Sequence, residues 1–193
     1  DRVPFTGTDE GGKTVPVAST PDGTLVALVF KSVTDKFAGA LAWTRVLRGR
    51  VARGDMVTIG STGKTGRVGR LLHLDGADLE DVEEATVGDV VAVAGLGELR
   101  TGESLCGSAE VVRFGNIVVP EPVIEVVVEA EKRADQDRIN AAMRRYAYED
   151  PSLRIGTDPE TGQTLVRGQG ELHLDVVLTR ARRELGLNIR SSA

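Results

Sequence analysis

The segment Gly7-Thr-Asp-Glu-Gly-Gly-Lys-Thr14 has the spacing of a phosphate-binding P-loop, in which a glycine is followed by four residues and then Gly-Lys-Thr. In that motif the backbone amides and the start of a helix converge on nucleotide phosphates, so a buried strand must precede the loop and a helix must follow it. Pro4 lies in the short stretch before Gly7, and Pro16 and Pro21 lie where the helix would run. We therefore expect no nucleotide site here. A P-loop nucleotide-binding enzyme using Gly7–Thr14 is kept as the alternative from a different class.

Histidine and cysteine offer little chemistry. The two histidines, His73 and His173, and the single cysteine, Cys106, do not have the spacing of a metal-ligand set. On a helix, His173 and Asp175 are two positions apart and point to different faces, and no nucleophile is arranged in sequence to use either. We assign His173 a structural or interface role, and we predict no catalytic, cofactor-binding or metal-binding residue in this chain.

Four arginines cluster around one predicted strand end and its turn: Arg45, Arg48, Arg50 and Arg53. The guanidinium fork matches the oxygens of a phosphate group, and helical RNA is recognised largely through its backbone. These arginines are therefore candidate RNA contacts. A solvated rim is an equally good interpretation of the same cluster.

Composition limits the classes of protein that fit. The chain has 193 residues, 40% hydrophobic and 4% aromatic, with 23 glycines and a formal charge of -5. Two domains with aliphatic cores fit this length, and neither side of Pro120 is basic enough for a general nucleic-acid module. A membrane helix needs roughly 18 consecutive apolar residues, and the sequence contains no such run. With one cysteine we expect a reducing, cytoplasmic setting, no membrane partner and a monomer. The chain lacks an initiator methionine, and we interpret it as a fragment.

Residues 1–119 are predicted to form an antiparallel β barrel. Short runs rich in valine, leucine and isoleucine, separated by glycine or aspartate, are typical of its strands. The predicted strands are Leu25–Phe30, Gly39–Leu47, Asp55–Ile59, Gly66–Leu72 and Gly88–Ala94. The acidic segment Leu79–Glu84 is predicted to be an exposed connection or a helical turn, and the glycine-rich Gly60–Gly66 a hairpin tip.

Residues 120–193 are predicted to form an α+β sandwich. Pro120 and Pro122 interrupt the preceding strand pattern, and the domain boundary is placed there. A strand from Ile124 is followed by a helix over 135–149, a hairpin, and a second helix that ends at Gly186 before a last strand. The helices present Ile139, Ala142, Met143 and Tyr146, and then Leu174, Val177, Leu178, Ala181 and Leu185, on one face. This β-α-β-β-α-β order predicts a ferredoxin-like fold.

Two stretches resemble a known family. Gly39–Ile59, with Arg45-Val46, Gly49 and Gly54-Asp55, resembles the second-domain barrel of translational GTPases. The stretch Pro120–Gly186 is similar to the third domain of elongation factor G, through Glu149-Asp-Pro, Pro159-Glu-Thr-Gly-Gln-Thr164 and Gly168-Gln-Gly-Glu-Leu-His-Leu-Asp175. The resemblance implies domains II and III of an elongation factor G-like translational GTPase, without its GTP-binding domain.

That resemblance also implies a function. In the family the barrel contacts small-subunit ribosomal RNA and packs on the GTPase domain, and the third domain helps to couple GTP hydrolysis to translocation. The resemblance places six residues at an interdomain surface on the side where fusidic acid binds: Ser152, Gly168, Gln169, Gly170, Glu171 and His173. It assigns GTP and magnesium to the parent protein, and it implies ribosome contact and signal transmission between domains, with no catalysis in the fragment.

Gln169 departs from the family pattern, in which methionine is usual. A divergent paralogue, such as a ribosome-protection or recycling factor, is therefore an open alternative to the main translocation factor. A free-standing module that binds a protein partner without ribosomes is another.

Overall fold

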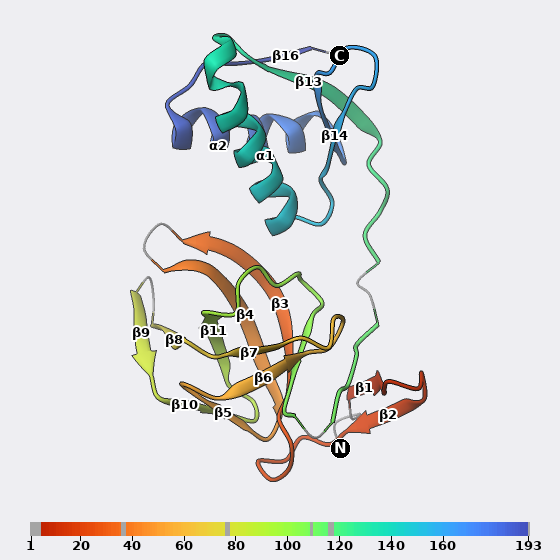
Figure 1. Cartoon of the computed structure of the whole chain (residues 1–193), viewed down its shortest axis with the longest axis vertical. Coiled ribbons are helices and arrows are strands. Elements are labelled where there is room, and N and C mark those ends of the chain that lie inside the picture. The colour runs from red at the N-terminus through yellow and green to blue at the C-terminus, as the bar shows by residue number, and fades with distance from the viewer. Residues whose placement is uncertain (1–4, 36–37, 76–77, 109, 116–117, 193) are drawn as a thin grey trace. The chain divides into compact units, whose positions relative to one another are not determined.

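The computed structural model describes residues 5–35, 38–75, 78–108, 110–115 and 118–192. The chain divides into two compact units, Asp1–Ile117 and Val118–Ala193 (Figure 1). The predicted domain division, between residues 119 and 120, lies two residues further along the chain. Each unit has its own buried apolar cluster.

The first unit is a curled antiparallel sheet that forms a half-barrel, in line with the predicted barrel, with strand order β7-β6-β12-β3-β4-β11-β8-β9 (Figure 1). Its strands are β3 (Val26–Asp35), β4 (Gly39–Arg48), β6 (Met56–Ile59), β7 (Thr65–Arg67), β8 (Arg70–Asp75), β9 (Asp78–Val82), β11 (Val90–Ala94) and β12 (Ser104–Cys106). Two small pairs accompany it: β1 (Phe5–Thr8) with β2 (Thr14–Val17), and β5 (Arg50–Ala52) with β10 (Glu84–Thr86).

The inner face of this sheet carries the alternating apolar residues that predicted its strands. Ala27 and Val29 of β3, Ala42 and Val46 of β4, and Val91 of β11 are all buried in one cluster. Alternation places every second side chain on the same face, so the period-2 pattern fixes which face is buried. Four of the five predicted strands are thereby confirmed, with shifts at their ends.

Two expectations about this unit are wrong. The acidic segment Leu79–Glu84 is neither a helical turn nor a plain connection, because it contains most of β9 and the start of β10. β9 pairs with β8 at the edge of the sheet and stays largely exposed, so it needs no alternating apolar residues. The predicted strand Gly66–Leu72 is two strands, β7 and β8, separated by Val68 and Gly69.

The P-loop-like string forms a hairpin. β2 begins at Thr14 and pairs with β1, and Asp9 Oδ1 accepts hydrogen bonds from the backbone amides of Gly11 and Lys13 at 2.9 Å each. The amides that would face a phosphate therefore turn inward onto a carboxylate. A strand begins at Thr14, where a P-loop requires a helix, so Gly7–Thr14 does not have P-loop geometry.

The second unit has the predicted β-α-β-β-α-β order. Its elements are β13 (Ile124–Ala130), the short 3-10 helix η1 (Arg133–Asp135), α1 (Gln136–Glu149), β14 (Arg154–Thr157), β15 (Thr164–Gly168), α2 (Glu171–Leu185) and β16 (Ile189–Ser192). The strands form one antiparallel sheet in the order β14-β15-β13-β16, which is the ferredoxin-like arrangement.

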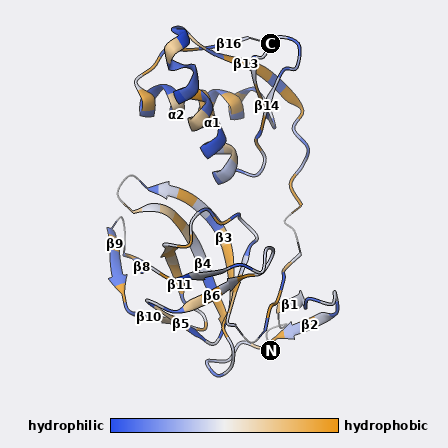
Figure 2. Cartoon of the chain, in the orientation of Figure 1, coloured by the Kyte–Doolittle hydropathy of each residue, from blue (hydrophilic) through white to orange (hydrophobic). Residues whose placement is uncertain are grey.

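The core of this unit lies between the sheet and the two helices. The predicted helix faces are buried: Ile139, Ala142, Met143 and Tyr146 of α1, and Leu174, Val177, Leu178 and Ala181 of α2. They pack with Val128, Val166 and Ile189 of the sheet. Both helices carry hydrophilic as well as hydrophobic residues, as expected of amphipathic helices covering a sheet (Figure 2). Gly186 ends α2 in the left-handed conformation, at φ 63°.

Candidate functional site

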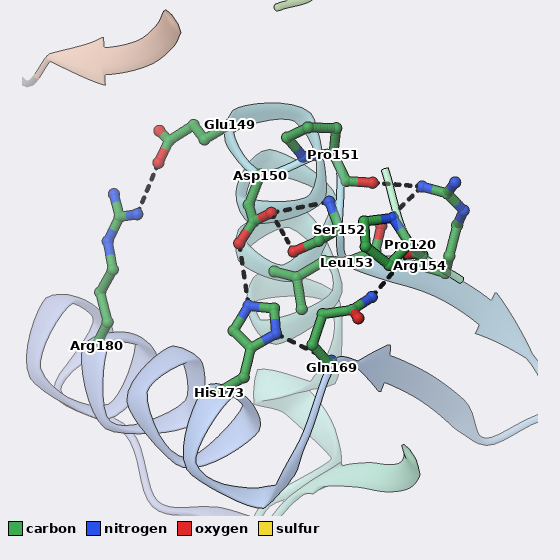
Figure 3. A network of polar contacts seen from close by, with 10 residues as sticks. All are labelled: Pro120, Glu149, Asp150, Pro151, Ser152, Leu153, Arg154, Gln169, His173 and Arg180. Carbon is green, nitrogen blue, oxygen red and sulfur yellow. Dashed lines mark hydrogen bonds and ion pairs between the residues drawn. The ribbon is translucent and has the colours of Figure 1, made fainter. Parts of the chain in front are cut away.

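Asp150, which caps the C-terminal end of α1, is the centre of a polar network in the second unit (Figure 3). Its Oδ1 accepts hydrogen bonds from the backbone amide of Ser152 at 2.8 Å and from the Ser152 hydroxyl at 2.5 Å. Its Oδ2 lies 3.0 Å from Nε2 of His173 on α2. An aspartate that bonds the backbone two residues further on forms an Asx turn, so this carboxylate both turns the chain after α1 and reaches α2.

The contacts of His173 define its tautomer. Its Nδ1 accepts a hydrogen bond from the backbone amide of Gln169 at 3.1 Å, so Nδ1 carries no proton. In the neutral ring the proton is then on Nε2, which donates to Asp150. Both ring nitrogens are therefore engaged, one by the turn before α2 and the other by the carboxylate after α1.

Although the network contains serine, histidine and aspartate, it is not arranged as a catalytic triad. In a triad the serine hydroxyl donates to the histidine, and the aspartate orients the far side of the ring. Here the Ser152 hydroxyl donates to Asp150, and the far side of the His173 ring accepts from a backbone amide. This arrangement can hold the end of α1 against the start of α2. We call Asp150, Ser152, His173 and Gln169 the clamp.

The clamp favours the ionised form of its carboxylate. Burial raises the pKa of Asp150, but the hydrogen bonds from Ser152 and His173 outweigh burial and hold this pKa below its ordinary value. The charged carboxylate is thus part of the folded arrangement at neutral pH.

Gln169 also fastens the segment that leads into β13. Its side-chain Nε2 donates to the Pro120 carbonyl at 2.8 Å (Figure 3). In addition, the Val123 amide donates to the Gly168 carbonyl at 3.0 Å. A Cβ atom at Gly168 would lie 2.7 Å from Leu174 Cδ2 and 3.1 Å from His173 Nδ1. A larger residue at position 168 would therefore force the Leu174 or His173 side chain to move.

The structure joins three of the six predicted interface residues, Ser152, Gln169 and His173, through the clamp. Gly168 packs against His173 without a side chain of its own. The other two begin α2 outside the clamp: the Gly170 carbonyl accepts the Leu174 amide at 3.1 Å, and the Glu171 side chain is exposed.

Sequence reasoning assigned no role to Asp150, which entered only as part of the Glu149-Asp-Pro motif. The signal was available, because an aspartate two residues before a serine, with a proline between them, is typical of an Asx turn. The contact with His173, 23 residues away along the chain, had no such local signal.

A second polar cluster lies beside the clamp, where Tyr146 meets α2. The Tyr146 hydroxyl donates to Glu184 at 2.9 Å. The guanidinium groups of Arg145 and Arg180 lie 5.0 and 4.4 Å from the centroid of the Tyr146 ring. Arg180 also pairs with Glu149 at 2.6 Å and with Glu184 at 2.7 Å. Burial and the Glu184 carboxylate raise the pKa of Tyr146 to about 12, so the neutral phenol is strongly favoured.

The four candidate RNA-contact arginines occupy different environments. Arg48 has a side chain only 14% exposed, donates to the Thr24 carbonyl at 2.9 Å and pairs with Glu110 at 2.5 Å. Arg50 pairs with Glu84 at 2.9 Å. Arg53 lies 3.9 Å from Glu83, and Arg45 is exposed on β4. The acidic partners come from distant segments and were invisible to the sequence pattern. They leave Arg45 and Arg53 the least engaged of the four.

The described residues contain no group of three or more histidine, cysteine, aspartate or glutamate side chains that could hold a metal ion. Within the same residues, neither helix has the length and apolar character needed to cross a membrane.

Comparison with known proteins identifies both units. Residues 24–108 match the family model described as elongation factor G domain 2, and residues 119–193 match that of elongation factor G, domain III. The chain belongs to the elongation factor G family. Its relatives include elongation factor G of Neorickettsia sennetsu, 38% identical over 98% of this chain, and that of Paracoccus denitrificans, 40% identical over 86%. A crystal structure from Thermus thermophilus superposes with a TM-score of 0.74 and 34% identity, and covers 89% of this chain.

The chain spans only about a quarter of the length of the proteins that it matches: 27% and 24% of the two curated relatives and 26% of the solved chain. The half-barrel unit is thus domain II, and the unit that carries the clamp is domain III. The resemblance stated from the sequence, and the fold class that came with it, are confirmed.

Replacing Asp150 with asparagine is expected to loosen domain III by about 1 to 2 kcal/mol at neutral pH, because hydrogen bonds to a charged group are lost. An asparagine that accepts from Ser152 must turn its NH2 group toward the protonated Nε2 of His173, which places two donors face to face. The free energy of unfolding is to be measured from amide signals of α1 and α2 during denaturant titration. Asp175→Asn, an exposed change on α2, is the matched control.

The sign of the pH dependence provides a second check on the clamp. Folding lowers the pKa of Asp150 below its ordinary value of 3.8, so its stabilising contribution is present above that pH and is lost as pH falls through the folded value. The difference between wild type and Asp150→Asn should therefore shrink in acid. A difference that stays constant down to the acid limit would contradict the role of the carboxylate charge.

Proposed function

We propose that this chain is the domain II and domain III portion of an elongation factor G that acts in ribosomal translocation during protein synthesis. The observation that carries the proposal is the identity of 38% to a protein named elongation factor G along 98% of the chain. The domains contribute ribosome contact and transmission between domains, and catalysis belongs to the GTPase domain of the parent, with its GTP and magnesium. The parent acts as a monomer in the cytoplasm.

The arrangement of domain III supports a mechanical role. Both nitrogens of the clamp histidine and both oxygens of its carboxylate are engaged, and the Asp150–His173 contact joins the two helices, which leaves no free base in the clamp. Gln169 extends the same set of contacts to Pro120. A domain whose helices and entry segment are fastened together moves as one body, and rigid bodies joined at a short segment are how domain-coupled machines transmit motion. The surface around Ser152 and 168–173 is the proposed contact with the neighbouring domains.

Small-subunit ribosomal RNA is the proposed partner of domain II. Of the four candidate arginines, Arg45, Arg50 and Arg53 have exposed side chains, whereas Arg48 is held inside the fold. A guanidinium that is exposed or loosely paired can exchange its partner for a phosphate oxygen. We assign direct RNA contact to the exposed three, and we assign Arg48 the task of holding the turn between β4 and β5 in place.

The test is ribosome binding by the full-length parent in the presence of a non-hydrolysable GTP analogue, measured over a series of salt concentrations. Arg45→Gln with Arg50→Gln is expected to weaken binding and to reduce the slope of log affinity against log salt by about 1 to 2. Each phosphate contact releases counterions when it forms, so the loss of two contacts lowers the number released on binding. Arg190→Gln, an exposed change in domain III, is the control.

Three outcomes discriminate the candidates. An unchanged salt slope would mean that the arginines form a solvated rim and do not contact RNA. Binding without stimulation of tRNA movement would favour a recycling or ribosome-protection paralogue. Absence of any nucleotide-dependent ribosome binding would favour a free-standing interaction module.

A further inference from the structure

An open hollow of about 440 Å³ lies in domain II where three connections meet. These are the turn between β5 and β6, the turn between β7 and β8, and the turn between β9 and β10, at the end of the sheet where β5 and β10 pair (Figure 1). The residues that line the hollow are Arg53, Gly54, Arg67, Val68, Gly69 and Glu83.

Backbone hydrogen bonds hold the walls of this hollow in place. The Arg53 amide donates to the Glu83 carbonyl at 2.9 Å, and the Gly54 amide donates to the Val68 carbonyl at 2.8 Å. The Gly69 amide donates to Ala94 of β11 at 2.9 Å. Each connection is thus tied to another part of the sheet, so the hollow is part of the fold and not a gap between loose loops.

Gly54 keeps space open beside Arg67. It has φ at 90°, a conformation that residues with side chains rarely adopt. A Cβ atom there would lie 3.3 Å from Arg67 Nη2. Among the lining residues, the polar side chains are those of Arg53, Arg67 and Glu83.

The two guanidinium groups are only partly engaged. Arg67 Nε donates to the Gly54 carbonyl at 3.2 Å, which orients the group and leaves its terminal nitrogens without a partner among the described residues. Arg53 Nη1 lies 3.9 Å from Glu83, whose side chain is 85% exposed. By contrast the nearby Arg70 makes a two-pronged pair with Asp81 at 2.9 and 2.7 Å. The lining therefore combines unused donors with a loosely held carboxylate that an anion can displace.

We propose that this hollow is a binding site for a phosphoryl oxyanion, held between the guanidinium groups of Arg53 and Arg67. Planar forks match the oxygens of a phosphate group, and an arginine already fixed through its Nε loses less freedom on binding. The site goes beyond the proposed function, because it includes Arg67 and needs no ribosome to form. The negative charge of Glu83 repels the anion and therefore lowers the affinity of the site.

The test is a titration of the 193-residue chain with inorganic phosphate and with pyrophosphate at constant ionic strength, followed by the NMR signals of the Arg67 Nε–H and the Gly69 amide. Saturable shifts are expected. Arg53→Gln and Arg67→Gln should each weaken binding at least fivefold, and Glu83→Gln should strengthen it severalfold. Arg100→Gln, which lies outside the hollow, should leave the affinity unchanged.

Arg67→Lys keeps the charge but removes the fork, and it should also weaken binding, which provides a second variant if Arg67→Gln does not fold. A short single-stranded RNA that competes with pyrophosphate would assign the site to backbone phosphate, and failure to compete would assign it to a free or terminal phosphate. Shifts that do not saturate, or equal affinities in wild type and both arginine variants, would overturn the proposal. Ribosome binding is measured separately, so failure of this site leaves the proposed function intact.

Discussion

Gly49→Ala is expected to cost domain II about 3 kcal/mol or more, a large share of the free energy of unfolding of a marginally stable domain. Gly49 lies between β4 and β5 with φ at 72°, in the left-handed region. A Cβ atom there would lie 2.7 Å from the Gly23 carbonyl oxygen and 3.1 Å from Leu25 Cα. These are backbone atoms, and Leu25 is buried while the Gly49 amide is bonded to Thr20 at 2.8 Å, so neither side can move away.

Gly63→Ala separates the cost of the left-handed backbone conformation from the cost of the close contacts with Gly23 and Leu25. Gly63 has nearly the same φ, 68°, but nothing lies within 4 Å of the position of its Cβ. Alanine there should cost only the left-handed strain, about 1 kcal/mol. Unfolding is to be followed by fluorescence of Trp43, the single tryptophan, which lies in β4. Equal losses in the two variants would show that the approach of Gly49 to Gly23 and Leu25 is not a constraint.

The fold of domain III could be predicted because every element carries a local signal. Ile139, Met143 and Tyr146 recur at helical spacing, the two prolines at 120 and 122 precede the first strand, and Gly186 ends α2. These local signals agree with the final packing, and such agreement across levels is what makes a sequence predictable.

Domain II was less predictable at its edge. β9 is held by pairing with β8 and not by burial, so its acidic sequence resembles a solvated connection. The backbone ladder that makes it a strand leaves no mark in side-chain hydropathy. The residue pattern therefore predicted the longer buried strands. It missed the exposed β9 and also β12, whose three buried residues are too short a run to show alternation.

Three members of the candidate site were predictable, but its central member and its contacts were not. Ser152, Gln169 and His173 came from a resemblance, whereas Asp150, whose carboxylate contacts Ser152 and His173, was missed. The arginines were recognised by type, whereas their partners, such as Glu110 for Arg48, are 62 residues away along the chain. Long-range polar pairs depend on the assembled fold, and one sequence does not show them.

Tyr146→Ala is expected to destabilise domain III by about 3 to 5 kcal/mol, the range for removing a large aromatic side chain from a core. Tyr146 is 2% exposed and belongs to the apolar cluster between the sheet and the helices. The substitution also removes the hydroxyl that donates to Glu184 and the ring that faces Arg145 and Arg180. Three charged groups would then border a cavity.

Two companion variants divide this loss into its parts. Tyr146→Phe keeps the ring and should cost about 1 kcal/mol, the contribution of one hydrogen bond. Arg144→Ala, exposed on the same helix, should change the stability by less than about 0.5 kcal/mol. Hydrogen exchange of the amides in β13 and β15 reports on domain III, and Trp43 fluorescence reports on domain II. The rigid-body proposal requires Tyr146→Ala to shift the first signal alone. An equal shift in both signals would mean that the two domains unfold as one cooperative body. That result would contradict the proposal that two independently rigid domains transmit motion.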